Sequence, residues 1–334
     1  MKATAQKAAV LMAQKNIKVQ DLINNYPPEY TNSFKKVMYE KAVKIHKTEH
    51  GIVKISRWKF CDERKSPLKM EANPIKVSAV DSFFDYSDID TETKNTFYLN
   101  YADPNLFGYY DGDLFAQDEI QTFEHPLLGS VLEYIDKNEI PNLVSRTVEK
   151  GNPTPFIVEN VPYWIKVDTL PVIKDEDGKD CVCSIYGWNF SHAPKEALEK
   201  GISVIHKEQK NNIIAVAALG GGRGTYTENQ IAFTLSSLLV SFGAAAKITT
   251  REKKNETVIH TGRWGCGAFG NNDEFIYLTQ IIAASFTGVT ELVFHGCDEE
   301  ILKKAWEKFE GWDKDHPMDF LLKQNYTWKN GDGK

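Results

Sequence analysis

The sequence predicts an α/β fold in which a mixed β-sheet is covered by helices. Two observations lead to this fold class. Segments with the apolar or alternating composition of strands recur from residue 77 onward. Longer segments with helical spacing lie between several of them. Strands and helices of these lengths, alternating along a chain, favour a mixed sheet with helices on both faces.

Seven segments in this part of the chain are expected to be strands. They cover residues 77–84, 96–101, 156–167, 181–189, 213–219, 258–261 and 291–295. Helices are expected at residues 226–246, with Thr225 and Glu228 as a capping box, and at residues 273–286. A further helix is expected to begin at Asp298.

The beginning of the chain differs from the rest. Residues 1–75 are predicted to form a helical N-terminal extension that precedes a main domain at residues 76–325. Helical spacing at residues 5–12 and 34–43 indicates this, and a pair of prolines separates the two segments.

Two smaller features of the chain are predicted to be solvent-exposed. His46 and His50 lie four residues apart, which suits a metal ligand pair on one helix face, but no third ligand is evident. We therefore expect a solvated pair of histidines. The polar tail from Lys323 is expected to fray.

Composition excludes several classes of function. A net charge of −6 over 334 residues argues against a basic nucleic-acid-binding surface. No apolar run reaches the roughly 20 residues that span a bilayer, so no membrane partner is expected. The first residues are too polar for a signal peptide, and five scattered cysteines suggest reduced thiols. The expected location is cytoplasmic, in the cell of origin or in a host cytosol reached by secretion.

A glycine-rich segment is the strongest functional signal. Residues 261–270 read TGRWGCGAFG and lie between a predicted strand and a predicted helix. Glycines permit positive φ and close approach of backbone N–H groups to a ligand. At a helix N-terminus such a loop favours phosphate oxygens. The alternative is a glycine-rich turn without a ligand.

An acidic segment is the second signal. Five carboxylates fall close together among aromatic and aliphatic residues: Asp103, Asp111, Asp113, Asp118 and Glu119. Mutual repulsion and apolar neighbours raise the pKa of at least one of them. A protonated carboxyl and an ionised neighbour suit cleavage of a glycosidic bond. The alternatives are an exposed acidic loop and a hard-cation site.

Together these two segments resemble the catalytic macrodomain of the poly(ADP-ribose) glycohydrolase family. That family has a Phe-Ala-Asn segment, a Gly-Gly-Gly turn, a Gln-Glu-Glu triplet and a TGNWGCGAFG diphosphate loop, in this order. The glycine loop of this chain differs from that pattern only at Arg263. The resemblance covers roughly residues 75–300 and implies a macrodomain-like α/β fold, an ADP-ribose ligand and glycosidase activity. Neither a cofactor nor a metal is expected.

The resemblance also implies roles for the acidic residues. Gln117-Asp118-Glu119 matches the Gln-Glu-Glu triplet, in which the last Glu acts at the glycosidic bond and its neighbour orients the distal ribose. Glu119 is therefore the candidate general acid/base, and Asp118 the residue that holds the ribose. Asp103 stands where the family has an Asn that contacts the ribose.

Binding residues follow from the same resemblance. The backbone amides of the loop are expected to hold the diphosphate: Gly265, Cys266, Gly267, Ala268, Phe269 and Gly270. Asp81 matches an acidic contact to the adenine, and Phe294, Tyr186 or Trp188 are candidates to stack on it. Arg263 is left with two interpretations, a pair with a phosphate or a pair with a surface acid.

One departure from the family predicts the substrate. The triple-glycine turn is replaced by residues 108–113, GYYDGD. More bulk and more negative charge disfavour an anionic polymer and attract a guanidinium. Asp103 or Asp111 would bind or protonate this leaving group, so both are candidate catalytic residues beside Glu119 and Asp118. We therefore expect removal of single ADP-ribose units from arginine side chains. A bacterial-effector branch that acts on ADP-ribosylated ubiquitin is similar in its acidic replacements, so ubiquitin is a candidate acceptor. The alternatives are a polymer glycohydrolase, a non-catalytic ADP-ribose-binding domain and a cation-dependent hydrolase.

Overall fold

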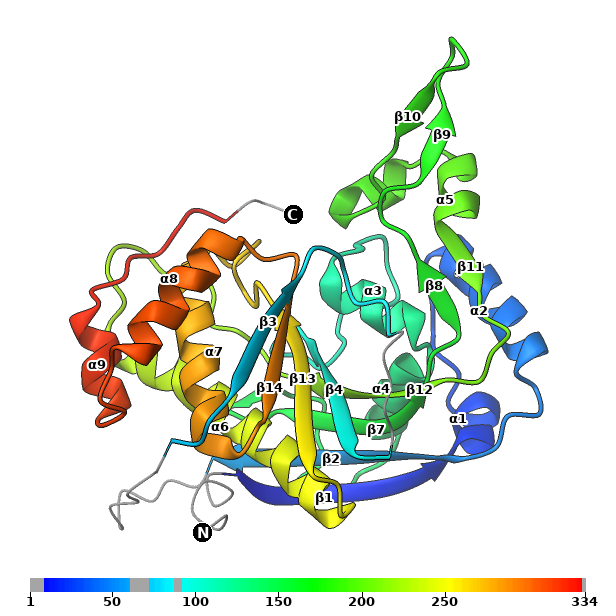
Figure 1. Ribbon diagram of the computed structural model, residues 1–334. Helices are drawn as coiled ribbons and strands as arrows, with labels where there is room; N and C mark the ends of the chain where they lie inside the picture. The colour runs from blue at the N-terminus through cyan, green and yellow to red at the C-terminus, as the bar shows by residue number, and fades with distance from the viewer. Residues whose placement is uncertain (1–8, 61–71, 87–91, 332–334) are drawn as a thin grey trace.

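The computed structural model describes residues 9–60, 72–86 and 92–331, and its centre is one mixed sheet of eight strands (Figure 1). The strand order is β1-β2-β7-β12-β4-β13-β14-β3. The strands are β1 (Ala9–Lys18), β2 (Ile52–Phe60), β7 (Phe156–Pro162), β12 (Lys210–Ala215), β4 (Lys94–Asn100), β13 (Glu256–Gly262), β14 (Glu291–His295) and β3 (Lys76–Val80).

The direction of the strands determines where a ligand can bind. Strands β12, β4, β13, β14 and β3 are mutually parallel, whereas β7, β2 and β1 continue the sheet in antiparallel fashion. The carboxyl ends of the five parallel strands therefore meet at one edge of the sheet. This edge is where α/β folds bind their ligands.

Helices cover both faces of the sheet, as the sequence predicts. One face packs against α6 (Glu228–Arg251), α7 (Asp273–Thr287), α8 (Glu299–Glu310) and α9 (Pro317–Lys323). The other face packs against α1 (Val19–Asn25), α2 (Ser33–Ile45), α3 (Gln117–Glu124), α4 (Leu127–Lys137) and α5 (Lys195–Gly201). Each face of the sheet has its own hydrophobic core, and successive strand residues alternate between the two. Ile214 lies in the core beneath α6–α9, and Ile213 lies in the core on the opposite face.

Short elements complete the fold outside the main sheet. Strands β8 (Ile165–Val167) and β11 (Ile202–Val204) form one two-stranded sheet, and β5 (Val148–Glu149) and β6 (Asn152–Pro153) form another. Strands β9 (Val172–Lys174) and β10 (Asp180–Val182) form a hairpin that projects from the body of the molecule (Figure 1). A 3₁₀ helix, η2 (Gly187–His192), follows the hairpin.

The N-terminal part of the chain is not the helical extension that the sequence predicts. The helix expected at residues 34–43 is confirmed as α2, but residues 9–12 lie in strand β1, while residues 5–8 are outside the described part. Strands β1 and β2 join the main sheet through β7. Helical spacing misled here because β1 is an edge strand, whose burial depends on distant partners and not on local periodicity.

His46 is also placed differently from the prediction. It is 5% exposed, its Nε2 lies 2.7 Å from the carbonyl oxygen of Ile205, and its ring stacks on Trp164 at 5.1 Å between centroids. It therefore packs between elements and is not one of a solvated pair. His50 is exposed, as expected.

Several boundaries differ from the predicted ones. Residues 181–189 are a strand only up to Val182, because the chain then leaves the hairpin for a loop and η2. Residues 156–167 divide into β7 and β8. The capping box of α6 consists of Thr227 and Gln230, two residues beyond the predicted pair. Asp298 caps α8 by accepting a hydrogen bond from the backbone N–H of Ile301 at 3.1 Å, which confirms the predicted start.

Helix α6 and the C-terminal tail are both packed into the molecule. Among the described residues α6 is the one helix long and apolar enough to cross a membrane, but 78% of its apolar window is buried inside the fold. The tail is not frayed up to residue 331, because Trp328 is 8% exposed and stacks on Tyr226 at 4.5 Å. A Cβ at Gly222 would lie 1.9 Å from the Trp328 ring, so the tail closes over the glycine run at residues 220–224.

Candidate active site

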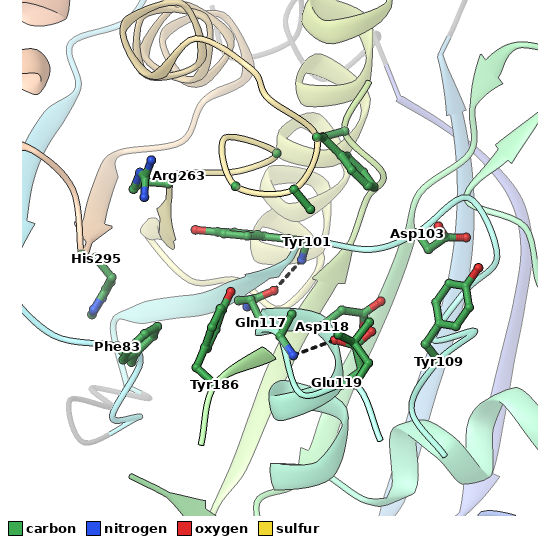
Figure 2. A pocket seen from close by; sticks show the side chains of 18 of the residues that line it. Phe83, Tyr101, Asp103, Tyr109, Gln117, Asp118, Glu119, Tyr186, Arg263 and His295 are labelled. Carbon is green, nitrogen blue, oxygen red and sulfur yellow. Dashed lines mark hydrogen bonds between the residues drawn. The ribbon is translucent and has the colours of Figure 1, made fainter. Parts of the chain in front are cut away.

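A cavity of about 430 Å³ opens at the carboxyl edge of the parallel strands. Segments that follow β3, β4, β12, β13 and β14 contribute to its wall, together with Tyr186 (Figure 2). Its lining residues are Phe83, Phe84, Tyr101, Asp103, Tyr109, Leu114, Ala116, Gln117, Asp118, Glu119, Tyr186, Ala218, Arg263, Gly265, Gly267, Ala268, Phe269, His295 and Gly296.

The glycine loop after β13 has a backbone that requires its glycines. Gly265 and Gly270 have φ of +72° and +70°, in the region that side chains rarely adopt. A Cβ at Gly265 would lie 2.4 Å from the Cβ of Ala218. Asn271 fixes the loop from within, donating to the carbonyls of Leu219 at 2.6 Å and Gly265 at 3.0 Å. The loop is thus preorganised, with its backbone against the cavity.

Not every residue of the predicted loop contacts the cavity. Gly267, Ala268 and Phe269 line it, as does Gly265, whereas Cys266 and Gly270 do not. The Cys266 side chain is turned into the core, and burial raises the pKa of its thiol. This placement agrees with a small residue in a tight loop and not with a nucleophile.

Arg263 combines features of both of its predicted interpretations. Its Nε donates to Oδ1 of Asp273 at 2.8 Å, and Lys329 from the tail donates to the other carboxylate oxygen at 2.6 Å. Burial acts to raise the pKa of Asp273, but these two cations lower it more. The Arg263 side chain is still 49% exposed and lines the cavity, so its remaining N–H groups face the space beside the loop.

The acidic side of the cavity is formed by the first turn of α3. Asp118 and Glu119 both line the cavity, although they are only 7% and 4% exposed. Burial and the neighbouring Glu119 raise the pKa of Asp118 to about 8, despite a 2.9 Å hydrogen bond donated by Asn100. Burial likewise raises the pKa of Glu119, whose Oε2 accepts a hydrogen bond from the backbone N–H of Ala116 at 3.0 Å. The pair therefore retains a proton near neutral pH.

Gln117 ties this helix to the sheet. Its Oε1 accepts from the backbone N–H of Tyr101 at 2.7 Å, and its Nε2 donates to the carbonyl of Leu99 at 3.1 Å. These hydrogen bonds hold the start of α3 against the end of β4 (Figure 2). The sequence assigned no role to Gln117 or to Asn100, although a polar residue at the end of a buried strand was a usable signal.

The other two predicted catalytic acids are placed differently from each other. Asp103 lines the cavity, with its Oδ1 accepting from the backbone N–H of Asn105 at 2.8 Å. Asp111 does not line the cavity, contrary to the position expected for it. Its carboxylate accepts from the Thr31 hydroxyl at 2.9 Å instead. Tyr109, 53% exposed, lines the wall that Asp111 was expected to form.

The glycine loop and the acid pair thus face one cavity, although they are far apart in the sequence. Gly267 and Glu119 both line this cavity. A family model described as poly (ADP-ribose) glycohydrolase (PARG), Macro domain fold, matches residues 179–304. The matched residues include the glycine loop but make up less than half of the chain.

Solved structures of a poly(ADP-ribose) glycohydrolase from Deinococcus radiodurans are similar to the chain over most of its length. One complex with ADP-ribose shares 10% identity, covers 92% of this chain and 99% of its own, and has a TM-score of 0.40. A second crystal form of that complex has 10% identity, coverage of 92% and 97%, and a TM-score of 0.39. The apo form has 8% identity, coverage of 92% and 95%, and a TM-score of 0.31. No curated protein matches the chain.

Two predicted adenine contacts lie outside the cavity. Asp81 is exposed and does not line the cavity, so its predicted contact is not formed there. Phe294 is fully buried in the core, edge-on to Tyr277 at 5.3 Å. The physical reason is strand alternation, which turns Phe294 into the core and presents the next residue, His295, to the cavity.

Other aromatic residues line the end of the cavity where the adenine is expected. The rings of Phe83 and Tyr186 are stacked at 6.1 Å and 26°, and both line the cavity. Trp188, 56% exposed, does not line it. His295 Nε2 lies 2.8 Å from Nδ1 of His260. Sequence reasoning missed Phe83 and Tyr109, because the loops that carry them have no periodic pattern. It missed His295 because only the register of β14 turns this residue toward the cavity. Within the described ranges, no three His, Cys, Asp or Glu side chains are grouped to hold a metal ion.

Proposed function

We propose that this protein hydrolyses the bond between ADP-ribose and a modified protein side chain, with arginine as the preferred acceptor. The observation that carries the proposal is the convergence of a preorganised glycine loop and a buried acid pair on one cavity. Such loops bind diphosphates, and such acids cleave glycosidic bonds.

The cavity can accommodate ADP-ribose in one orientation. The loop backbone from Gly265 to Phe269 would bind the diphosphate, with Arg263 adding a positive charge beside it. The adenine would pack at the aromatic end formed by Phe83 and Tyr186. The distal ribose would then reach Asp118 and the other acids of the opposite end.

The acid pair supplies the chemistry at the anomeric carbon. A water molecule attacks this carbon as the bond to the acceptor nitrogen breaks. Glu119 accepts the proton of the water and supplies a proton to the leaving nitrogen. The products are ADP-ribose and the unmodified side chain. Glu119 is the proposed acid/base, and Asp118, held by Asn100, is the proposed ribose ligand.

The preference for arginine is inferred from the acidic end. Three carboxylates line it, those of Asp103, Asp118 and Glu119. Among the described lining residues Arg263 is the one Lys or Arg, and it belongs to the loop end. The exposed ring of Tyr109 stands beside these acids and can stack on a guanidinium (Figure 2). A cationic acceptor is therefore attracted and an anionic polymer repelled.

A second candidate is hydrolysis of poly(ADP-ribose) itself. The family description supports it directly, and the same acid pair would cleave the ribose–ribose bond. The two candidates differ at Asp103, which stands where the family has Asn. Substituting Asp103→Asn restores the amide without changing the size of the side chain.

The test is hydrolysis of two substrates by three proteins. Wild type should release ADP-ribose from an arginine-linked mono-ADP-ribosylated protein, with ubiquitin as one acceptor, faster than from polymer. D103N should lower the ratio of the two rates by about tenfold, the worth of one charged contact. E119Q should lose about 100-fold or more in kcat, whereas E139Q, an exposed control, should not. Release from polymer alone would refute the arginine preference. Full activity of E119Q would refute the role of Glu119, and no hydrolysis by wild type would leave a binding domain.

A further inference from the structure

A lysine from the N-terminal part of the chain is buried behind the acidic end of the cavity. Lys35 of α2 is 0% exposed, and its Nζ donates to the carbonyls of Tyr110 at 3.0 Å and Leu114 at 3.1 Å. The rings of Phe115 and Phe190 lie 5.2 and 5.5 Å from the ammonium. A buried ammonium is costly unless its donors are bound, so these contacts fix both the lysine and the turn at residues 110–114.

The same stretch of chain binds this turn at further points. The Thr31 hydroxyl donates to Oδ2 of Asp111 at 2.9 Å, and Asn32 Nδ2 donates to Oδ1 of Asp113 at 2.8 Å. The backbone N–H groups of Thr31 and Asn32 both donate to the Asp111 carbonyl. The turn leads directly into Ala116, the N-cap of α3. Residues 31–35 therefore fasten the segment that presents the acid pair.

The ammonium also acts on the acids through its charge. Burial lowers the pKa of Lys35 to about 8, and the carboxylates that oppose this effect are Glu119, Asp111, Asp113 and Asp118, in decreasing order. Reciprocally, Lys35 lowers the pKa of Glu119, which burial and Asp103 raise. Among these carboxylates, the one with the largest electrostatic effect on Lys35 is thus Glu119, the proposed catalytic residue.

We propose that Lys35 is a positioning residue of this active site, which holds the acidic turn in place and tunes the ionisation of Glu119 without touching the substrate. It does not line the cavity, so it acts only through the turn and through its charge. This inference rests on the proposed hydrolase function. It gives the N-terminal segment a role in catalysis that the sequence did not indicate.

The test compares Lys35→Met with Lys36→Met. Lys36 is the next residue of α2 and is exposed, so the control removes the same charge from the same helix. K35M should lower kcat by about 100-fold, as expected for displacement of a catalytic group by about 1 Å. Its affinity for ADP-ribose, measured by calorimetry, should stay within about threefold of wild type, because the glycine loop lies on the other wall. K36M should match wild type in both measurements.

A pH profile separates positioning from general stability. Loss of the ammonium raises the pKa of Glu119, so the limb of the kcat profile governed by that acid should move to higher pH by about one unit in K35M. K35R keeps the charge and should keep the limb near its wild-type position. Identical profiles and rates in K35M and K36M would overturn the inference while leaving the hydrolase function intact.

Two further outcomes are distinguishable. If wild type hydrolyses no ADP-ribosylated substrate, the proposed function fails and the inference falls with it. If K35M does not fold, Thr31→Val decides, because Thr31 is exposed and its loss removes only a side-chain bond to the turn. T31V should lower kcat by about fivefold, the worth of one hydrogen bond; an unchanged kcat would count against the proposal.

Discussion

Alanine at Gly265 tests the glycine loop more sharply than any other single change. The substitution places a side chain at φ +72° and brings its Cβ to 2.4 Å from the Cβ of Ala218 and 2.8 Å from Nδ2 of Asn271. The backbone conformation alone costs about 1–2 kcal/mol. The two contacts are much shorter than van der Waals distance, and neither neighbour is the end of a long flexible chain. The loop itself must therefore move.

The expected consequence is weaker binding of ADP-ribose. A hydrogen bond to a charged phosphate contributes about 1.5–3 kcal/mol, so loss of one such bond should weaken binding by about 10- to 100-fold. Calorimetric titration with ADP-ribose measures this loss directly. Gly178→Ala is the matched control, because Gly178 has φ +76° and nothing within 4 Å of the added Cβ. It carries the same backbone strain without a clash and should bind normally.

A second-site change distinguishes displacement of the loop from unfolding. Ala218→Gly removes the nearer of the two obstructing atoms, so the double variant with Gly265→Ala should recover part of the lost affinity. Thermal unfolding of each variant should show that the single change leaves the protein folded at the assay temperature. If G265A binds ADP-ribose as tightly as wild type, the loop does not hold the diphosphate and the orientation inferred for the ligand is wrong.

Three other predictions follow from the structure. The pKa of Asp118 is raised to about 8, so between about pH 4 and pH 8 the folded protein binds a proton that the unfolded chain lacks, and the stability that Asp118 contributes falls as pH rises through that window. The melting temperature of D118N, relative to that of wild type, should therefore rise from pH 5 to pH 8. The opposite trend would contradict this. Gly222→Ala should displace Trp328, 1.9 Å from the added Cβ, and lower the free energy of unfolding in urea by about 2–3 kcal/mol; an unchanged urea midpoint would show that the tail packs elsewhere. Phe83→Ala should weaken ADP-ribose binding by about fivefold in calorimetry, whereas Asp81→Asn, outside the cavity, should not; equal effects would remove the aromatic end from the site.

Local patterns in the sequence predicted the parts of the site that depend on neighbours along the chain. Strand β13, the glycine loop and α7 follow one another without a break, so their order alone places the loop at a strand end. Glu119 and Asp118 likewise fall in the first turn of a short helix. The convergence of the two segments was predictable because parallel strands bring their carboxyl ends to one edge.

The remaining errors arose where long-range packing decides the structure. Asp111 was assigned to the cavity because of its charge, yet its orientation is determined by Thr31, eighty residues away in the sequence. Phe294 and His295 differ by one position along β14, and only the register of the strand decides which one reaches the cavity. No periodicity in the first residues indicated that β1 and β2 pair with the sheet.

Because β1 and β2 form the outer strands at one margin of the sheet, truncating the chain before the main domain would expose a new sheet edge. A fragment starting near residue 76 would leave the outer backbone groups of β7 without partners, and such a bare edge invites pairing between molecules. It would also lack Lys35. Precipitation or inactivity of that fragment would therefore report damage to the enzyme's own framework, and not the loss of a module that recruits targets.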